Sequence, residues 1–120
     1  MANTKHEIRI VTKIVHELTQ YFLVHGHKRV TIETVLEDKV TYFHITIPKR
    51  INNEVLETMQ AKLSRKRELE VETYGFELVG DIDAKSELEI VGVLIDEMAY
   101  TRRDDETVIT LSRTSMYRQS

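Results

Sequence analysis

Two short hairpin patterns, one in each half of the sequence, constrain the fold more than any other feature. Residues 30–36 and 40–47 are rich in β-branched side chains and roughly alternate in polarity, with a short polar connection between them. Residues 98–102 and 107–113 repeat this arrangement. The two strands of a hairpin run antiparallel, so we expect antiparallel pairing. Pro48 ends the second strand because proline has no amide proton for a ladder.

The segments around the hairpins have helical periodicity. Residues 4–24 place apolar side chains at helical spacing, and Gly26 is a natural stop. A second helix begins after a cap at Asn52 or Asn53. Its predicted buried stripe is Val55, Leu56, Met59 and Leu63. A charged run over 64–72 and a weaker helical period to Gly80 follow. The last predicted helix begins at Ser86, with a buried stripe of Leu88, Val91 and Ile95.

The order of elements predicts the fold class. Two hairpins separated by helices indicate an α+β domain. We expect an antiparallel, mixed-order sheet of about four strands with helices packed on one face. The predicted domain covers residues 1–114, and residues 115–120 are expected to be a frayed tail.

Composition excludes several classes of protein. The chain has 120 residues and a formal net charge of −3, which argues against a dedicated nucleic-acid binder. It has no cysteine, so disulfides, zinc-thiolate sites and a cysteine nucleophile are excluded. No apolar run approaches the length of a membrane span, and residues 1–7 lack the apolar core of a signal peptide. These features predict a cytoplasmic protein.

Two stretches of the sequence carry a resemblance to a known family. Residues 17–26 read Glu-Leu-Thr-Gln-Tyr-Phe-Leu-Val-His-Gly, and residues 90–100 precede the strand at 107–111. This pattern resembles the ATP-binding domain shared by sensor histidine kinases and anti-sigma-factor serine kinases, the GHKL or Bergerat fold. The resemblance implies a minimal histidine-kinase-ATPase-like sandwich. It also implies a nucleotide site for ATP with magnesium, partners such as sigma factors or their antagonists, and frequent homodimers.

The nucleotide motifs of that family are altered in this chain. The magnesium-binding asparagine corresponds to Tyr21, and phenol is a poor magnesium ligand. The adenine-binding Asp-x-Gly-x-Gly corresponds to residues 46–51, which read Thr-Ile-Pro-Lys-Arg-Ile. Two glycines of the phosphate loop correspond to Lys85 and Glu87. Side chains there block backbone approach to phosphate, and an acidic one repels it. Only Glu17, at the position of the family's general base, is retained, and it is expected to be a surface residue.

Three other clusters have structural and functional interpretations. His25 and His27, with His44, could ligate a metal, but a polar helix end followed by a strand is favoured. The basic cluster 64–67, with Lys62, could contact RNA, a phosphate or an acidic partner, but the acidic residues after it favour a solvated helix face. The Asp96–Glu97 pair could act as acid and base, but adjacent residues at a helix end usually point apart.

The expected function is a regulatory protein-binding module, not an enzyme, with no cofactor or metal and with a regulator or sigma-factor-like protein as partner. One alternative is a weak ATP-binding serine kinase with Glu17 as its base, for which Glu17, Tyr21 and Glu87 would lie at the site of ATP with magnesium. Another is a structural subunit of a larger assembly, which predicts an exposed apolar patch. Self-association through the first helix is a further expectation; nucleic acid and membrane are not expected partners.

Overall fold

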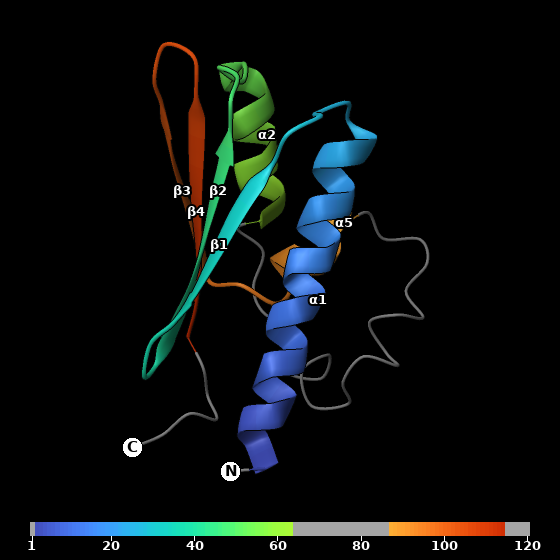
Figure 1. Cartoon of the computed structure of the whole chain (residues 1–120), viewed down its shortest axis with the longest axis vertical. Coiled ribbons are helices and arrows are strands. Elements are labelled where there is room, and N and C mark those ends of the chain that lie inside the picture. The colour runs from blue at the N-terminus through green and yellow to red at the C-terminus, as the bar shows by residue number, and fades with distance from the viewer. Residues whose placement is uncertain (1, 64–86, 115–120) are drawn as a thin grey trace.

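The computed structural model describes residues 2–63 and 87–114 (Figure 1). The predictions made for the basic cluster 64–67, for the helical period to Gly80, for Lys85 and for the tail 115–120 concern residues outside these ranges. None of the described helices is long and apolar enough to span a lipid bilayer.

The elements follow the predicted order. Helix α1 (Ala2–Val24) precedes strands β1 (Thr31–Leu36) and β2 (Val40–Ile47), and helix α2 (Asn53–Leu63) follows them. Helix α5 (Glu87–Gly92) leads into strands β3 (Glu97–Arg102) and β4 (Thr107–Thr114). The four strands form one antiparallel sheet in the order β1-β2-β4-β3, which confirms the predicted fold class.

The centre of the sheet joins the two hairpins. Strands β2 and β4 are distant in sequence and pair with Phe43 opposite Leu111 and Ile45 opposite Ile109. These four side chains are fully buried. Figure 1 shows α1, α2 and α5 on the same side of the sheet. On the other face, the rings of Tyr42 and His44 stack on neighbouring positions of β2. The core therefore lies between the sheet and a single layer of helices.

The end of α1 is a tight glycine cap. The amide of His27 donates to the carbonyl of Phe22 at 3.0 Å, and the amide of Gly26 donates to that of Leu23 at 3.1 Å. This is the Schellman arrangement, in which the residue after the helix takes a positive φ. Gly26 has a φ of 91°, which glycine adopts without a Cβ penalty. The predicted stop at Gly26 is confirmed, and it turns the following residues toward β1.

Helix α2 differs in part from its predicted form. Asn52 caps α2, since its Oδ1 accepts the amide of Glu54 at 2.7 Å. Of the predicted stripe, Leu56, Met59 and Leu63 are buried, but Val55 is 47% exposed, so its predicted burial is wrong. Val55 lies about 100° around the helix from Leu56, beyond the edge of the buried stripe.

Helix α5 is shorter than predicted. It ends at Gly92. The amides of Leu94 and Ile95 then both donate to the carbonyl of Val91 and close a turn. Ile95 is still fully buried, but in the connection to β3. The pair Asp96–Glu97 was predicted to lie at the end of a helix. This prediction is wrong, because α5 ends at Gly92. Asp96 accepts the amide of Thr114 at 2.6 Å, and exposed Glu97 begins β3.

A buried ion pair crosses the core between the first helix and the last strand. The Nε and Nη2 atoms of Arg113 donate to the two carboxylate oxygens of Glu7 at 2.8 and 2.9 Å. Its Nη1 donates to the carbonyl of Leu94 at 2.7 Å. Both charged side chains have 0% exposure. The pair therefore ties α1, β4 and the turn after α5 together.

Candidate functional site

A hollow of about 320 Å³ opens between the last turn of α1 and the start of α2. Five apolar side chains form its floor and walls: Phe22, Ile51, Val55, Leu56 and Met59. Six polar side chains form its rim: Tyr21, His25, His27, Lys49, Arg50 and Asn52. We call this hollow the basic cleft, because no aspartate or glutamate lines it.

The backbone between β2 and α2 is held in place beside the basic cleft. Pro48 follows the last residue of β2, and the chain then turns, with the amide of Lys49 donating to the carbonyl of Ile47 at 2.7 Å. Buried Thr107 at the start of β4 fixes this turn. Its hydroxyl donates to the carbonyl of Lys49 at 2.7 Å and accepts the amide of Ile51 at 2.9 Å. The side chains of Lys49 and Arg50 consequently project from a fixed backbone and remain exposed.

A second hollow of about 470 Å³ adjoins the basic cleft and shares Tyr21, His25, Val55 and Met59 with it. Its charged side chains are mixed in sign: Glu54, Lys62 and Glu87. Half-buried Tyr21 stands between the two hollows, and its ring lies 4.2 Å from that of His25. Burial and then the negative charge of Glu87 raise the pKa of the Tyr21 phenol. Gln20 donates to Glu87 at 3.0 Å, which links α1 to α5 beside this hollow.

The positions matched to the three nucleotide motifs meet at these hollows. Tyr21 and residues 49–51 line the basic cleft, and Tyr21 and Glu87 line the adjoining hollow. Glu17 lines neither of them. It is 5% exposed and pairs with Lys13, whose Nζ lies 2.7 Å from its carboxylate. The expectation that Glu17 lies on the surface is wrong, since its side chain is buried and pairs with Lys13 of the same helix.

The three histidines weighed as a metal site do not converge. Nδ1 of His25 lies 2.8 Å from the carbonyl of Tyr21, and the ring of His27 packs edge-on against Phe22. His44 lies on the face of the sheet opposite the helices, and its Nδ1 is 3.2 Å from the hydroxyl of Thr110. Within residues 2–63 and 87–114, no group of three or more His, Cys, Asp or Glu side chains could hold a metal ion.

The surroundings of His27 in the basic cleft lower the pKa of its ring. Partial burial, the positive charge of Lys49 and the proximity of His25 lower the pKa of His27, in that order of importance. Each of these causes disfavours the protonated ring. A positive field of this kind favours anionic groups at the rim.

We expect the lowered pKa of His27 to make the protein less stable in mild acid. The unfolded chain takes up a proton near its ordinary pKa of about 6.5, whereas the folded chain takes it up only at lower pH. The free energy of unfolding therefore falls as the pH drops from about 6.5 toward the folded pKa. Urea unfolding at several pH values should show a shallower fall for His27→Gln. Lys49→Gln, which removes one of the causes, should give an intermediate slope, and equal slopes for all three proteins would contradict this account.

The basic rim is not predicted by any single motif, although the sequence contains a signal for it. His25, His27, Lys28 and Arg29 precede β1, and Lys49 and Arg50 follow β2. The outer ends of a hairpin lie side by side, since its strands are antiparallel. Two basic clusters that flank one predicted hairpin therefore meet in the fold.

We compared the chain with protein-family models, with curated proteins and with solved structures, and it matches none of them.

Proposed function

We propose that this protein is a regulatory protein-binding module whose fold resembles a GHKL ATPase domain but whose cleft serves docking instead of nucleotide chemistry. The observation that carries the proposal is the lining of the two adjoining hollows. Tyr21, residues 49–51 and Glu87 surround them, where the resemblance places a magnesium ligand and two glycine loops. The proposed partner is a regulator or a sigma-factor-like protein, and the proposed location is the cytoplasm.

Nucleotide binding is disfavoured by the chemistry of these side chains. Triphosphate sites on this kind of fold need close approach of backbone amides, which glycine permits and larger residues block. Glu87 adds a negative charge beside Tyr21, and a phosphate would be repelled there. Glu17, which the kinase alternative requires as a base, pairs with Lys13 and lines neither hollow.

Docking is favoured by the combination of apolar walls and a charged rim. Protein interfaces gain most of their affinity from a few apolar anchors in pockets, and their selectivity from surrounding charges. Val55 presents an exposed apolar side chain at the mouth of the basic cleft. Buried Phe22, Leu56 and Met59 form a fixed wall behind it.

The test is a titration with ATP and magnesium during thermal unfolding. We expect no change in the midpoint for the native sequence or for Tyr21→Asn, which supplies the side chain that the family uses at this position. Magnesium alone is the control. A ligand at a hundred times its Kd stabilises the folded state by about 2.7 kcal/mol, which raises the midpoint of a domain this size by several degrees. A saturable rise of that kind with ATP would overturn the proposal.

The alternative of a structural subunit makes a separate prediction. A structural subunit buries part of its surface only against the other subunits of an assembly. The purified chain should therefore not persist as a folded monomer. Sedimentation equilibrium over a range of concentrations separates the two cases, because a docking module remains folded as a monomer or a defined dimer.

A further inference from the structure

We propose that the basic cleft captures a partner segment in which one apolar side chain is flanked by acidic residues. This inference rests on the proposed docking function and adds the place and the chemistry of recognition. It follows from the volume of the cleft, from the sign of its rim and from the absence of internal counter-charges.

The volume and walls of the cleft suit a single large side chain. At about 320 Å³ it lies at the small end of the range of ligand pockets. Phe22, Ile51, Leu56 and Met59 are each at most 5% exposed, so the walls are held by the core and need not rearrange. A leucine or phenylalanine side chain of a partner would bury apolar area against them.

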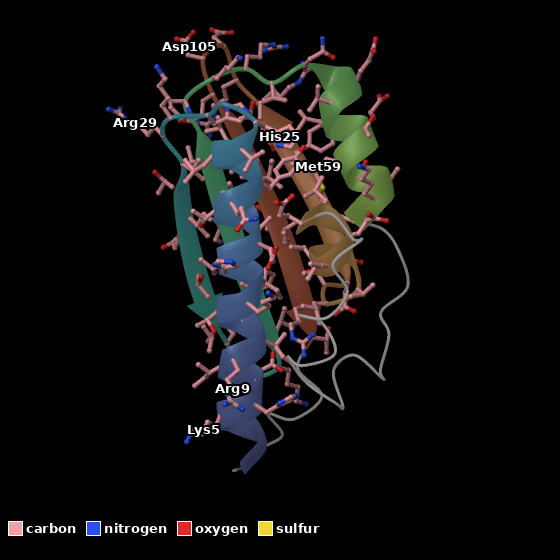
Figure 2. All side chains as sticks on the ribbon, turned by 90° about the vertical axis from the view of Figure 1, so that its right-hand side faces the viewer. Lys5, Arg9, His25, Arg29, Met59 and Asp105 are labelled. Carbon is pink, nitrogen blue, oxygen red and sulfur yellow. The ribbon has the colours of Figure 1, made fainter. Side chains whose placement is uncertain are left out.

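The rim has one sign of charge. Lys49 and Arg50 line the cleft with His25 and His27, while the whole chain has 20 acidic against 17 basic residues. The positive rim is therefore a local feature and not a consequence of composition. Figure 2 places His25 and Met59 at the same end of the molecule as Arg29, which extends the basic surface toward β1.

No carboxylate of the described residues neutralises Lys49 or Arg50 at the rim. Among the residues that the structure describes, neither Lys49 nor Arg50 forms an ion pair. Arg50 donates instead to the main-chain carbonyl of Arg103, at 3.1 Å. A partner's carboxylates would meet cations that no described carboxylate already pairs, and complementary charge of this kind selects partners and speeds association.

The experiment is an array of nine-residue peptides probed with the full chain, labelled at its N-terminus. The central residue is Leu, Phe or Gly, and the flanks are acidic, Gly-Ser or basic. We expect binding only where an apolar centre is combined with acidic flanks. The best peptide is then titrated in solution by fluorescence anisotropy, and its affinity should fall as salt is raised, because screening weakens exposed charge pairs.

Two double variants make a matched comparison. Lys49→Glu with Arg50→Glu reverses two charges at the cleft, and Lys5→Glu with Arg9→Glu reverses two at the far end of the molecule (Figure 2). We expect at least a tenfold loss of peptide affinity from the first and a change of less than twofold from the second. Val55→Asp should also weaken binding about tenfold or more, because it places a carboxylate at the apolar mouth.

Three outcomes would overturn the inference. They are an array without preference for acidic flanks, an equal loss of affinity in both double variants, and tighter binding of a ten-nucleotide single-stranded DNA than of any peptide. The ATP titration tests the proposed function separately, so these three outcomes can be told apart from a failure of that function. Peptide failure without an ATP response would leave a docking module that uses another surface.

Discussion

Glu7→Gln is expected to lower the free energy of unfolding by about 3–5 kcal/mol, which is the usual cost of removing one partner of a buried ion pair. The substitution removes the negative charge that the Nε and Nη2 atoms of fully buried Arg113 contact. The neutral amide can accept through only one of its two terminal atoms, whereas the carboxylate accepts from both Nε and Nη2. Urea unfolding followed by circular dichroism measures the loss.

The matched control replaces both charges. Glu7→Leu with Arg113→Met removes the ion pair and fills its place with apolar side chains of similar size. Such replacements are often neutral or stabilising, because the desolvation cost of two charges disappears. We therefore expect the double variant to be more stable than Glu7→Gln. A loss below about 1 kcal/mol for Glu7→Gln, which is typical of exposed pairs, would show that the pair is not buried in solution.

Gly92→Ala is expected to destabilise the protein by about 1–3 kcal/mol, because overpacking of a filled interior has costs of this size. A Cβ at Gly92 would lie 2.6 Å from the carbonyl oxygen of Lys62 and 3.5 Å from the Cα of Leu63. Both are backbone atoms at the end of α2, so no side-chain rotation relieves the clash. The helix α5 must move away from α2.

The steric clash and the higher helix propensity of alanine change the free energy of unfolding of Gly92→Ala in opposite directions, so the sign of the measured change shows which effect is larger. Alanine in an unobstructed helix is more favourable than glycine by about 1 kcal/mol, so a gain would show that α5 does not pack as closely on α2 as the structure has it. Gly26→Ala is the comparison variant, since nothing lies within 4 Å of its Cβ and only its positive φ opposes the change. Thermal and urea unfolding of both variants separate a steric cost from a backbone cost.

The candidate site was predictable in part. The resemblance in residues 17–26 and 90–100 drew attention to Tyr21 and Glu87, and both line one hollow in the structure. The resemblance also points to Glu17, but its side chain is buried and pairs with Lys13 away from both hollows. Lys49 and Arg50 differ from a glycine motif of that family, and this difference alone does not predict a basic rim. Their role as a rim depends on His27, which the hairpin brings beside them.

The buried ion pair also had a signal in the sequence. Glu7 extends the helical stripe of Val11, Ile14 and Leu18 toward the N-terminus, and Arg113 extends the inward-facing row of Ile109 and Leu111. Each charge therefore occupies a position where its pattern predicts an apolar side chain. A buried charge needs a partner, and the two opposite charges complete each other.

Local patterns suffice to predict the elements, their order and the antiparallel pairing within each hairpin. These depend on local periodicity, on Pro48 and on Gly26, which act within a few residues of their own position. Contacts between segments distant in sequence set the pairing of β2 with β4, the burial of Glu17, the exposure of Val55 and the position of α1 beside α2, which gives the basic cleft its apolar walls. The periodicity of one segment shows which of its faces is apolar, but it does not show which other segment packs on that face.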